Sequence, residues 1–146
     1  MDKELAFRIV LEKPPAGIDF GLQKGSGSKY ETIQKQRSEN KDLNFEFIVR
    51  IKNNTSAQPI FLGPFAQGSS ADRFIYIDIG SCAGQFNTVW SRRLKVPLSG
   101  ITQDMINEMM TDTNLLLETK VPGTGKDGGP NCATVKPFSG WQLKPL

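Results

Sequence analysis

Histidine is absent from this chain of 146 residues, and its absence excludes whole classes of function. Nucleophile systems of the Ser-His-Asp or Cys-His type lose their base. Zinc sites of the usual kind need histidine or clustered cysteines, and a pH switch built on histidine is excluded as well. We therefore expect no catalytic residue of these types, no metal site and no cofactor.

Cysteine is nearly as scarce, and long apolar runs are missing. Cys82 and Cys132 stand far apart and form no disulfide framework, so two reduced thiols are expected, with pairing between them as the alternative. No window approaches the roughly 20 apolar residues of a membrane helix. The amino-terminal segment alternates and meets two prolines, unlike a signal peptide. These features predict a cytoplasmic protein without a membrane partner.

Neither sign of charge dominates. The chain has 18 basic and 15 acidic residues, for a net charge of +3. Its densest basic group is Arg92-Arg93-Leu94-Lys95, whereas nucleic-acid binders usually carry a larger excess on one stripe. Most of these charges are expected on solvated faces, so a nucleic-acid partner is not expected.

The chain does contain the material for one well-packed β domain. Its length is that of a single domain, and hydrophobic residues make up 38% of it, with nine Phe. Apolar and polar residues alternate in several short segments, as expected of strands with one buried face. The segments are 5–12, 18–23, 43–52, 90–98 and 114–121, with shorter ones at 59–62 and 132–143. Segment 73–79 is aromatic and β-branched on both faces, which predicts a strand covered on both sides.

A single short helix is predicted after residue 102. Thr102 can cap it, Asp104 favours its first turn, and Met105 and Met109 fall on one side. The polar stretch 30–41 is assigned no element, and the glycine-rich residues 121–130 are interpreted as a loop. About seven to nine short strands and one short helix predict a mainly β domain over residues 1–146, an antiparallel sandwich or barrel.

Two glycine-rich segments fail the tests for phosphate-binding loops. Before Gly125-Lys126, the position that needs glycine holds Lys120, and Asp127 replaces the hydroxyl that would reach magnesium. After Gly25-Ser26-Gly27, Tyr30 holds the place of the third glycine of the dinucleotide fingerprint. Both segments are interpreted as loops that serve turns.

Candidate binding residues gather on two loops and one strand. Asp78 shares a face of strand 73–79 with Tyr76, and a desolvated carboxylate there can mark a site, although a structural pair with an arginine is the simpler interpretation. Loops 23–30 and 65–73 carry amides and cations, and their glycines let the backbone approach a ligand closely. The predicted ligand-binding residues are Gln23, Lys24, Gln67, Arg73, Tyr76, Asp78 and Arg92, with Arg93 as a further donor.

Two other groups of residues are less favoured as functional sites. Asp104, Glu108 and Asp112 share a helix face and could hold a hard cation, but a solvated outer face is favoured. Four aromatic residues could stack on sugars or bases, but core packing is favoured for them. These aromatic residues are Tyr30, Tyr76, Trp90 and Trp141.

Four short blocks stand in order along the chain: residues 17–25, 63–68, 73–80 and 90–95. Together they resemble a family of small uncharacterised bacterial proteins, a domain of unknown function, from about Leu5 to Trp141. The resemblance implies a bacterial, intracellular origin. It carries over no activity, cofactor or catalytic residue.

Three classes of function remain. The first is a binding module that holds a small polar or anionic ligand with loops at one end of the β scaffold. The second is an enzyme with Asp78 and Tyr76 as acid and base. The third is an interaction protein, such as a homo-oligomer, whose aromatic strand edges pair with another chain. We rank them in this order.

Overall fold

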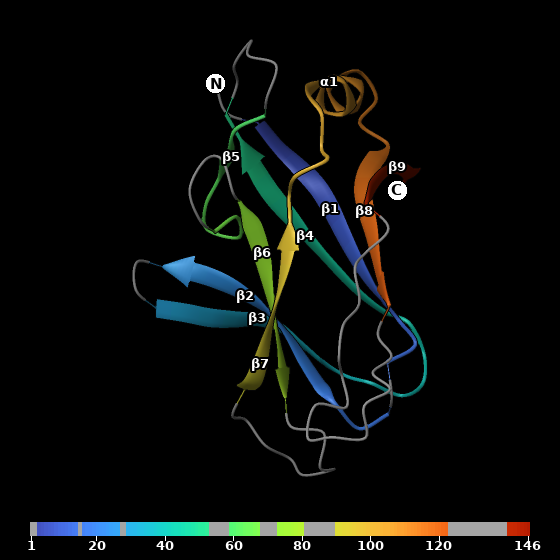
Figure 1. Ribbon diagram of the computed structural model, residues 1–146. Coiled ribbons are helices and arrows are strands. Elements are labelled where there is room, and N and C mark those ends of the chain that lie inside the picture. Colours follow the sequence, from blue (N-terminus) through green and yellow to red (C-terminus); the bar gives the residue numbers. More distant parts are fainter. Residues whose placement is uncertain are drawn as a thin grey trace.

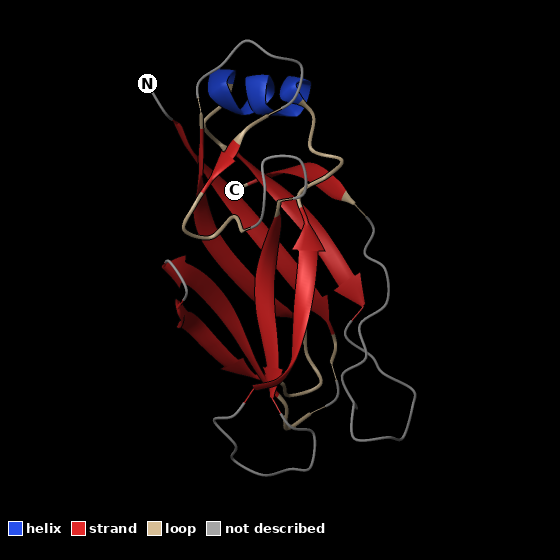
Figure 2. Ribbon diagram, turned by 60° about the vertical axis from the view of Figure 1, so that its left-hand side comes forward, coloured by secondary structure: helices blue, strands red, loops and turns tan. Residues whose placement is uncertain are grey.

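Two β-sheets pack face to face in the computed structural model, and one helix lies across one end of the sandwich (Figure 1 and Figure 2). The structure describes residues 3–14, 16–26, 29–52, 59–67, 73–80, 90–122 and 140–146, without the side chains of residues 26, 90–93 and 122. The buried apolar side chains of both sheets form one core cluster between them.

The larger sheet has five strands in the order β5-β4-β1-β8-β9. They are β1 Lys3–Glu12, β4 Leu43–Ile51, β5 Phe61–Leu62, β8 Leu115–Pro122 and β9 Trp141–Pro145. β1 and β8 run parallel, and the other neighbours in this sheet are antiparallel. The expectation of antiparallel pairing is therefore wrong for this one pair, because strand direction depends on where a long connection brings the chain back.

The smaller sheet has four strands in the order β3-β2-β6-β7, all antiparallel to their neighbours. They are β2 Asp19–Ser26, β3 Lys29–Arg37, β6 Phe74–Gly80 and β7 Trp90–Pro97. In Figure 1, β2 and β3 fan away from β6 and β7. The predicted mainly β architecture with one short helix is confirmed, and it is a sandwich.

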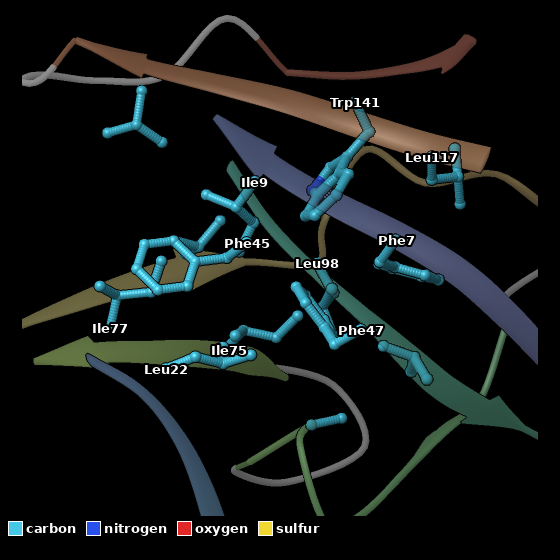
Figure 3. Close-up of a cluster of buried hydrophobic side chains, with 14 of the residues drawn as sticks. Phe7, Ile9, Leu22, Phe45, Phe47, Ile75, Ile77, Leu98, Leu117 and Trp141 are labelled. Atoms are coloured by element: carbon cyan, nitrogen blue, oxygen red, sulfur yellow. The ribbon is translucent and has the colours of Figure 1, made fainter. Parts of the chain in front are cut away.

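The core follows from the alternation in the sequence. In β4 every second side chain is buried, from Leu43 to Ile51, and those between are exposed. Figure 3 shows Phe45 and Ile9 of the larger sheet meeting Ile77 and Leu22 of the smaller one. Six of the seven residues of β6 are buried, which confirms the prediction of a strand covered on both faces.

The two sheets approach each other along one side through glutamine side chains. Gln36 Nε2 donates to the carbonyl of Asn44 at 2.7 Å, and Gln34 Nε2 donates to the carbonyl of Glu46. Both carbonyls belong to β4, while the glutamines belong to β3 of the other sheet. Because β3 and β4 share no backbone pairing in the described chain, the barrel does not close.

The strand β3 occupies the polar stretch to which the sequence assigned no element. Apart from Tyr30 and Ile33 its side chains are polar, so the alternation that marks the other strands is missing. Likewise, Gly25 and Ser26 were interpreted as loop residues but extend β2, and Ser26 pairs with Lys29 in the hairpin. Pairing with neighbours, rather than burial of an apolar face, holds these residues in strands.

The predicted helix is confirmed as α1 Gln103–Thr111. The hydroxyl of Thr102 accepts a hydrogen bond from Met105 N at 3.2 Å, and Ile106 and Met109 are buried. Among the described residues, no helix has the length and apolar character needed to cross a membrane. In the same residues, no group of three or more acidic or cysteine side chains could hold a metal ion.

Candidate ligand-binding site

The candidate site lies on the outer face of the four-stranded sheet. In β6, Ile75, Ile77 and Ile79 belong to the core, so Phe74, Tyr76 and Asp78 lie on the opposite face. Asp78 is 2% exposed and Tyr76 is 9% exposed. Asp78 pairs in register with Gly21 of β2, which has no side chain to fill the space beside the carboxylate.

A second polar side chain on this face, Gln23, lies beside a bulge in the β2–β3 pair. The register shifts between Leu22 and Gln23, so that Gln23 lies opposite Thr32. Gln23 Nε2 donates to Thr32 Oγ1 at 2.8 Å and to the Gly21 carbonyl at 3.3 Å. Gln23 is 2% exposed, and its amide is therefore held in one orientation.

Aromatic rings form one wall of the site. The ring centroids of Tyr30 and Tyr76 are 5.3 Å apart, and those of Phe74 and Tyr76 are 4.8 Å apart. Lys95 Nζ lies 4.9 Å from the centroid of the Phe74 ring, within the range of a cation–π contact. Tyr30 is 43% exposed, so this wall offers a ligand both an accessible aromatic ring and the cation of Lys95.

An ion pair closes the other end of the face. Arg37 Nε and Nη2 donate to the two carboxylate oxygens of Asp19 at 2.9 and 3.1 Å, and Lys35 Nζ lies 3.7 Å from Oδ2. The hydrogen bonds from Arg37 lower the pKa of the Asp19 carboxyl, against an opposing effect of burial. The Asp19 side chain is 6% exposed, and its charge is therefore balanced by Arg37 and Lys35.

This ion pair should make stability depend on pH. Because the pKa of Asp19 is lower in the folded than in the unfolded chain, the pair stabilises the fold above the unfolded pKa. That contribution is lost as the pH falls through the folded pKa. We expect Asp19→Asn to be less stable than the wild type at neutral pH, with the difference shrinking on acidification. Urea unfolding at a series of pH values measures this, and a difference independent of pH would contradict it.

The two predicted loops meet at the open end of β2. Gly25 N donates to the Pro64 carbonyl at 2.9 Å, and Gln67 pairs with Phe74 through both backbone groups, at 2.8 and 3.0 Å. The Gln67 amide also donates to the Pro64 carbonyl and lies where a side chain on residue 25 would be. Residues 64–67 are therefore held between the end of β2 and the start of β6.

The model of a family of unknown function (DUF5990) matches residues 5–144. The chain belongs to this family. The resemblance to a domain of unknown function, drawn from four short blocks, is thereby confirmed. No curated protein and no solved structure matches the chain.

The structure brings three of the predicted residues of this DUF5990 chain to one face: Gln23, Tyr76 and Asp78. Lys24 alternates with Gln23 and pairs with Glu31, which places it on the other face of β2. Position 92 pairs with Ile79, whereas position 93 pairs with Asp78. The side chains of Arg92 and Arg93 lie outside the described residues.

The remaining two predicted residues, Gln67 and Arg73, brace the adjoining loop. Arg73 Nη1 donates to the Ala66 carbonyl at 3.1 Å, and its Nε is buried without a partner among the described residues. Gln67 donates to carbonyls of its own loop. Sequence reasoning left Thr32, Lys35, Arg37, Phe74 and Lys95 out of the site. A predicted strand at 29–37 would have pointed to the first three.

The contact between Gly25 and Gln67 can be tested in this DUF5990 chain. A methyl group at residue 25 meets the Gln67 amide, which must leave the Pro64 carbonyl. We expect Gly25→Ala to cost about 1 kcal/mol, the net value of a hydrogen bond, because the obstructing group is the end of a flexible side chain. In a double-mutant cycle measured by urea unfolding, Gln67→Ala should remove most of that cost. Additive effects of the two substitutions would show that the contact is unimportant.

Proposed function

We propose that the outer face of the four-stranded sheet binds a small polar ligand that carries an anionic group. One observation carries the proposal: polar side chains are buried on a sheet face that ordinarily meets water. Six polar or charged residues are buried in the described chain, and Asp19, Gln23 and Asp78 of this face are three of them. Asp19 is paired with Arg37 and Lys35, and Gln23 is paired with Thr32. Their concentration as buried polar groups on one outer sheet face is the feature that favours a site.

The groups around this face indicate the chemistry of the ligand. The rings of Tyr30 and Phe74 offer contacts to a flat ring or a sugar face. Lys95 is exposed beside the Phe74 ring and can pair with a phosphate or carboxylate. A phosphorylated or carboxylated ring compound of modest size combines both features.

A thermal-shift screen tests the proposal directly. Nucleotides, sugar phosphates and cyclic carboxylic acids are suitable probes, because a ligand that binds only the folded state raises the melting temperature. For a compound that binds, we expect Lys95→Ala and Tyr30→Ala each to weaken affinity about tenfold. The matched control is Lys120→Ala, an exposed lysine on the other sheet, which should bind normally. A ligand that binds equally to all three variants would place the site elsewhere.

The enzyme hypothesis uses the same face, with Asp78 and Tyr76 as acid and base. These residues are two apart on β6 and share its outer face, which is the observation in its favour. Recovery of the bound compound unchanged after long incubation with the protein would support binding without catalysis. Recovery of a chemically altered compound would establish catalysis.

A cytoplasmic location is part of the same proposal. Its support is the scarcity of cysteine, since cytoplasmic thiols stay reduced. Cys82 and Cys132 lie outside the described residues. Both should react with a thiol reagent after denaturation without reductant, and a mass of the protected protein corresponding to a disulfide would contradict the proposal.

A further inference from the structure

The side-chain amide of Gln23 is anchored through its nitrogen alone. Nε2 donates to Thr32 Oγ1 at 2.8 Å and to the Gly21 carbonyl at 3.3 Å. A backbone carbonyl only accepts hydrogen bonds, so the second contact requires the NH₂ end of the amide at this position. Both N–H groups are thus used within the sheet, and the orientation of the amide is fixed.

The oxygen of this amide is available to a ligand. No described residue donates a hydrogen bond to Gln23 Oε1. In the described chain, the side-chain polar atoms that are both buried and unpaired are Arg73 Nε and Thr119 Oγ1, and Gln23 Oε1 is not one of them. Although Gln23 as a whole is 2% exposed, this oxygen therefore keeps contact with solvent. The side chain presents an oriented acceptor that cannot turn away.

Thr32 adds a donor beside this acceptor. Its Oγ1 accepts the hydrogen bond from Gln23 Nε2, and no described residue accepts the hydrogen of the hydroxyl itself. Thr32 is half-buried, so its side chain is accessible as well. The two residues therefore offer one acceptor and one donor next to each other on the outer face of the sheet.

Aromatic rings adjoin this pair. Gly21 lies opposite Asp78 in antiparallel strands, so Gln23 and Tyr76 are the next residues along the same face. Tyr30 lies two residues before Thr32 in β3, and its ring centroid is 5.3 Å from that of Tyr76. A flat ring that packs on the exposed Tyr30 ring can therefore turn one edge toward Gln23 and Thr32.

We propose, on the basis of the ligand site proposed above, that Gln23 and Thr32 select a heterocycle with a hydrogen-bond donor and an acceptor on one edge, as in the amide-like edge of a nucleobase. The donor of the ring binds Gln23 Oε1, and its acceptor binds the Thr32 hydroxyl. A ring that lacks this edge leaves both protein groups unpaired in a largely buried place, which weakens its binding. With Lys95 for the phosphate, the ligand class is a nucleoside phosphate.

Isothermal titration calorimetry with two nucleotides tests this selection. Inosine monophosphate has an N–H and a carbonyl on one edge of its base, whereas purine riboside monophosphate has neither and is otherwise the same. We expect the wild type to bind the inosine compound about tenfold more tightly. Ribose phosphate, which lacks the base, should bind more weakly than either.

Two results would overturn the selection by Gln23 and Thr32. If all three compounds bind with equal affinity, the edge of the ring is not recognised, although the proposed ligand site still stands. If neither nucleotide binds, the ligand class is wrong, and the cyclic carboxylic acids of the wider screen then decide separately whether the face binds a ligand.

Substitutions at Thr32 assign the preference to this pair of residues. Thr32→Val replaces the hydroxyl by a methyl group and should remove the preference, whereas Thr32→Ser keeps the hydroxyl and should retain it. The matched control is Thr113→Val, an exposed threonine between α1 and β8, which should also retain it. Urea unfolding establishes that each variant is folded. A preference that survives in folded Thr32→Val, or that is absent from the wild type, would contradict the proposal.

Discussion

Replacing Phe7 with alanine is expected to lower the free energy of unfolding by about 3–5 kcal/mol, the usual cost of emptying a buried aromatic site. Phe7 is 1% exposed. Its ring centroid lies 5.3 Å from that of Trp141, 5.9 Å from that of Phe47 and 6.3 Å from that of Phe61. The cavity would therefore remove contacts from strands β4, β5 and β9 together.

Urea unfolding measures the effect, provided that the slope of the transition is unchanged. Tyr30→Ala is the matched control, because it truncates an aromatic residue that is 43% exposed. We expect the control to cost well under half as much as Phe7→Ala. Equal losses would mean that Phe7 does not lie in the shared core.

Replacing Trp141 with alanine is expected to cost a similar amount, about 3–5 kcal/mol. Trp141 belongs to β9 of the larger sheet, yet its Nε1 donates to the Pro97 carbonyl at the end of β7 at 2.9 Å. Figure 3 shows its ring among Phe7, Leu98 and Leu117. The side chain thus packs in the core and joins the two sheets by a hydrogen bond.

A second substitution separates these two contributions. Trp141→Phe keeps an aromatic ring in the core but loses the donor to Pro97, so it should cost about 1–3 kcal/mol, the cost of an unsatisfied buried carbonyl plus some lost packing. Unfolding of both variants in urea gives the comparison. A loss in Trp141→Phe as large as in Trp141→Ala would show that the hydrogen bond, rather than the ring, dominates.

Alternation of apolar residues was enough to predict β1 and β4, and a segment apolar on both faces predicted β6. Each of these strands buries one full face against the core, so hydrophobic burial alone selects the strand conformation and its inward face. The helix was predictable for a local reason as well, because the Thr102 cap acts within one turn. Core packing was favoured for four aromatic residues, and it is confirmed for Trp141 and Tyr76 but wrong for Tyr30, which is 43% exposed; the Trp90 side chain lies outside the described residues.

The alternation of apolar residues could not predict the polar strand β3 or which residues are neighbours across strands. The side chains of β3 find their partners on other strands: Gln36 on a carbonyl of β4, and Arg37 on Asp19 of β2. The site was predicted in part for the same reason. Tyr76 and Asp78 share a strand, so their common face follows from period-two geometry, whereas Thr32 and Lys95 reach it only through register.

The sequence by itself determined a mainly β fold with one capped helix and no histidine chemistry, because composition and local periodicity act over a few residues. Tertiary structure alone decided the parallel pairing of β1 with β8, the bulge that aligns Gln23 with Thr32, and the meeting of residues 64–67 with the end of β2. Each of these depends on contacts between segments far apart in the chain. Their free energy comes from pairing and burial that exist only once both sheets have formed.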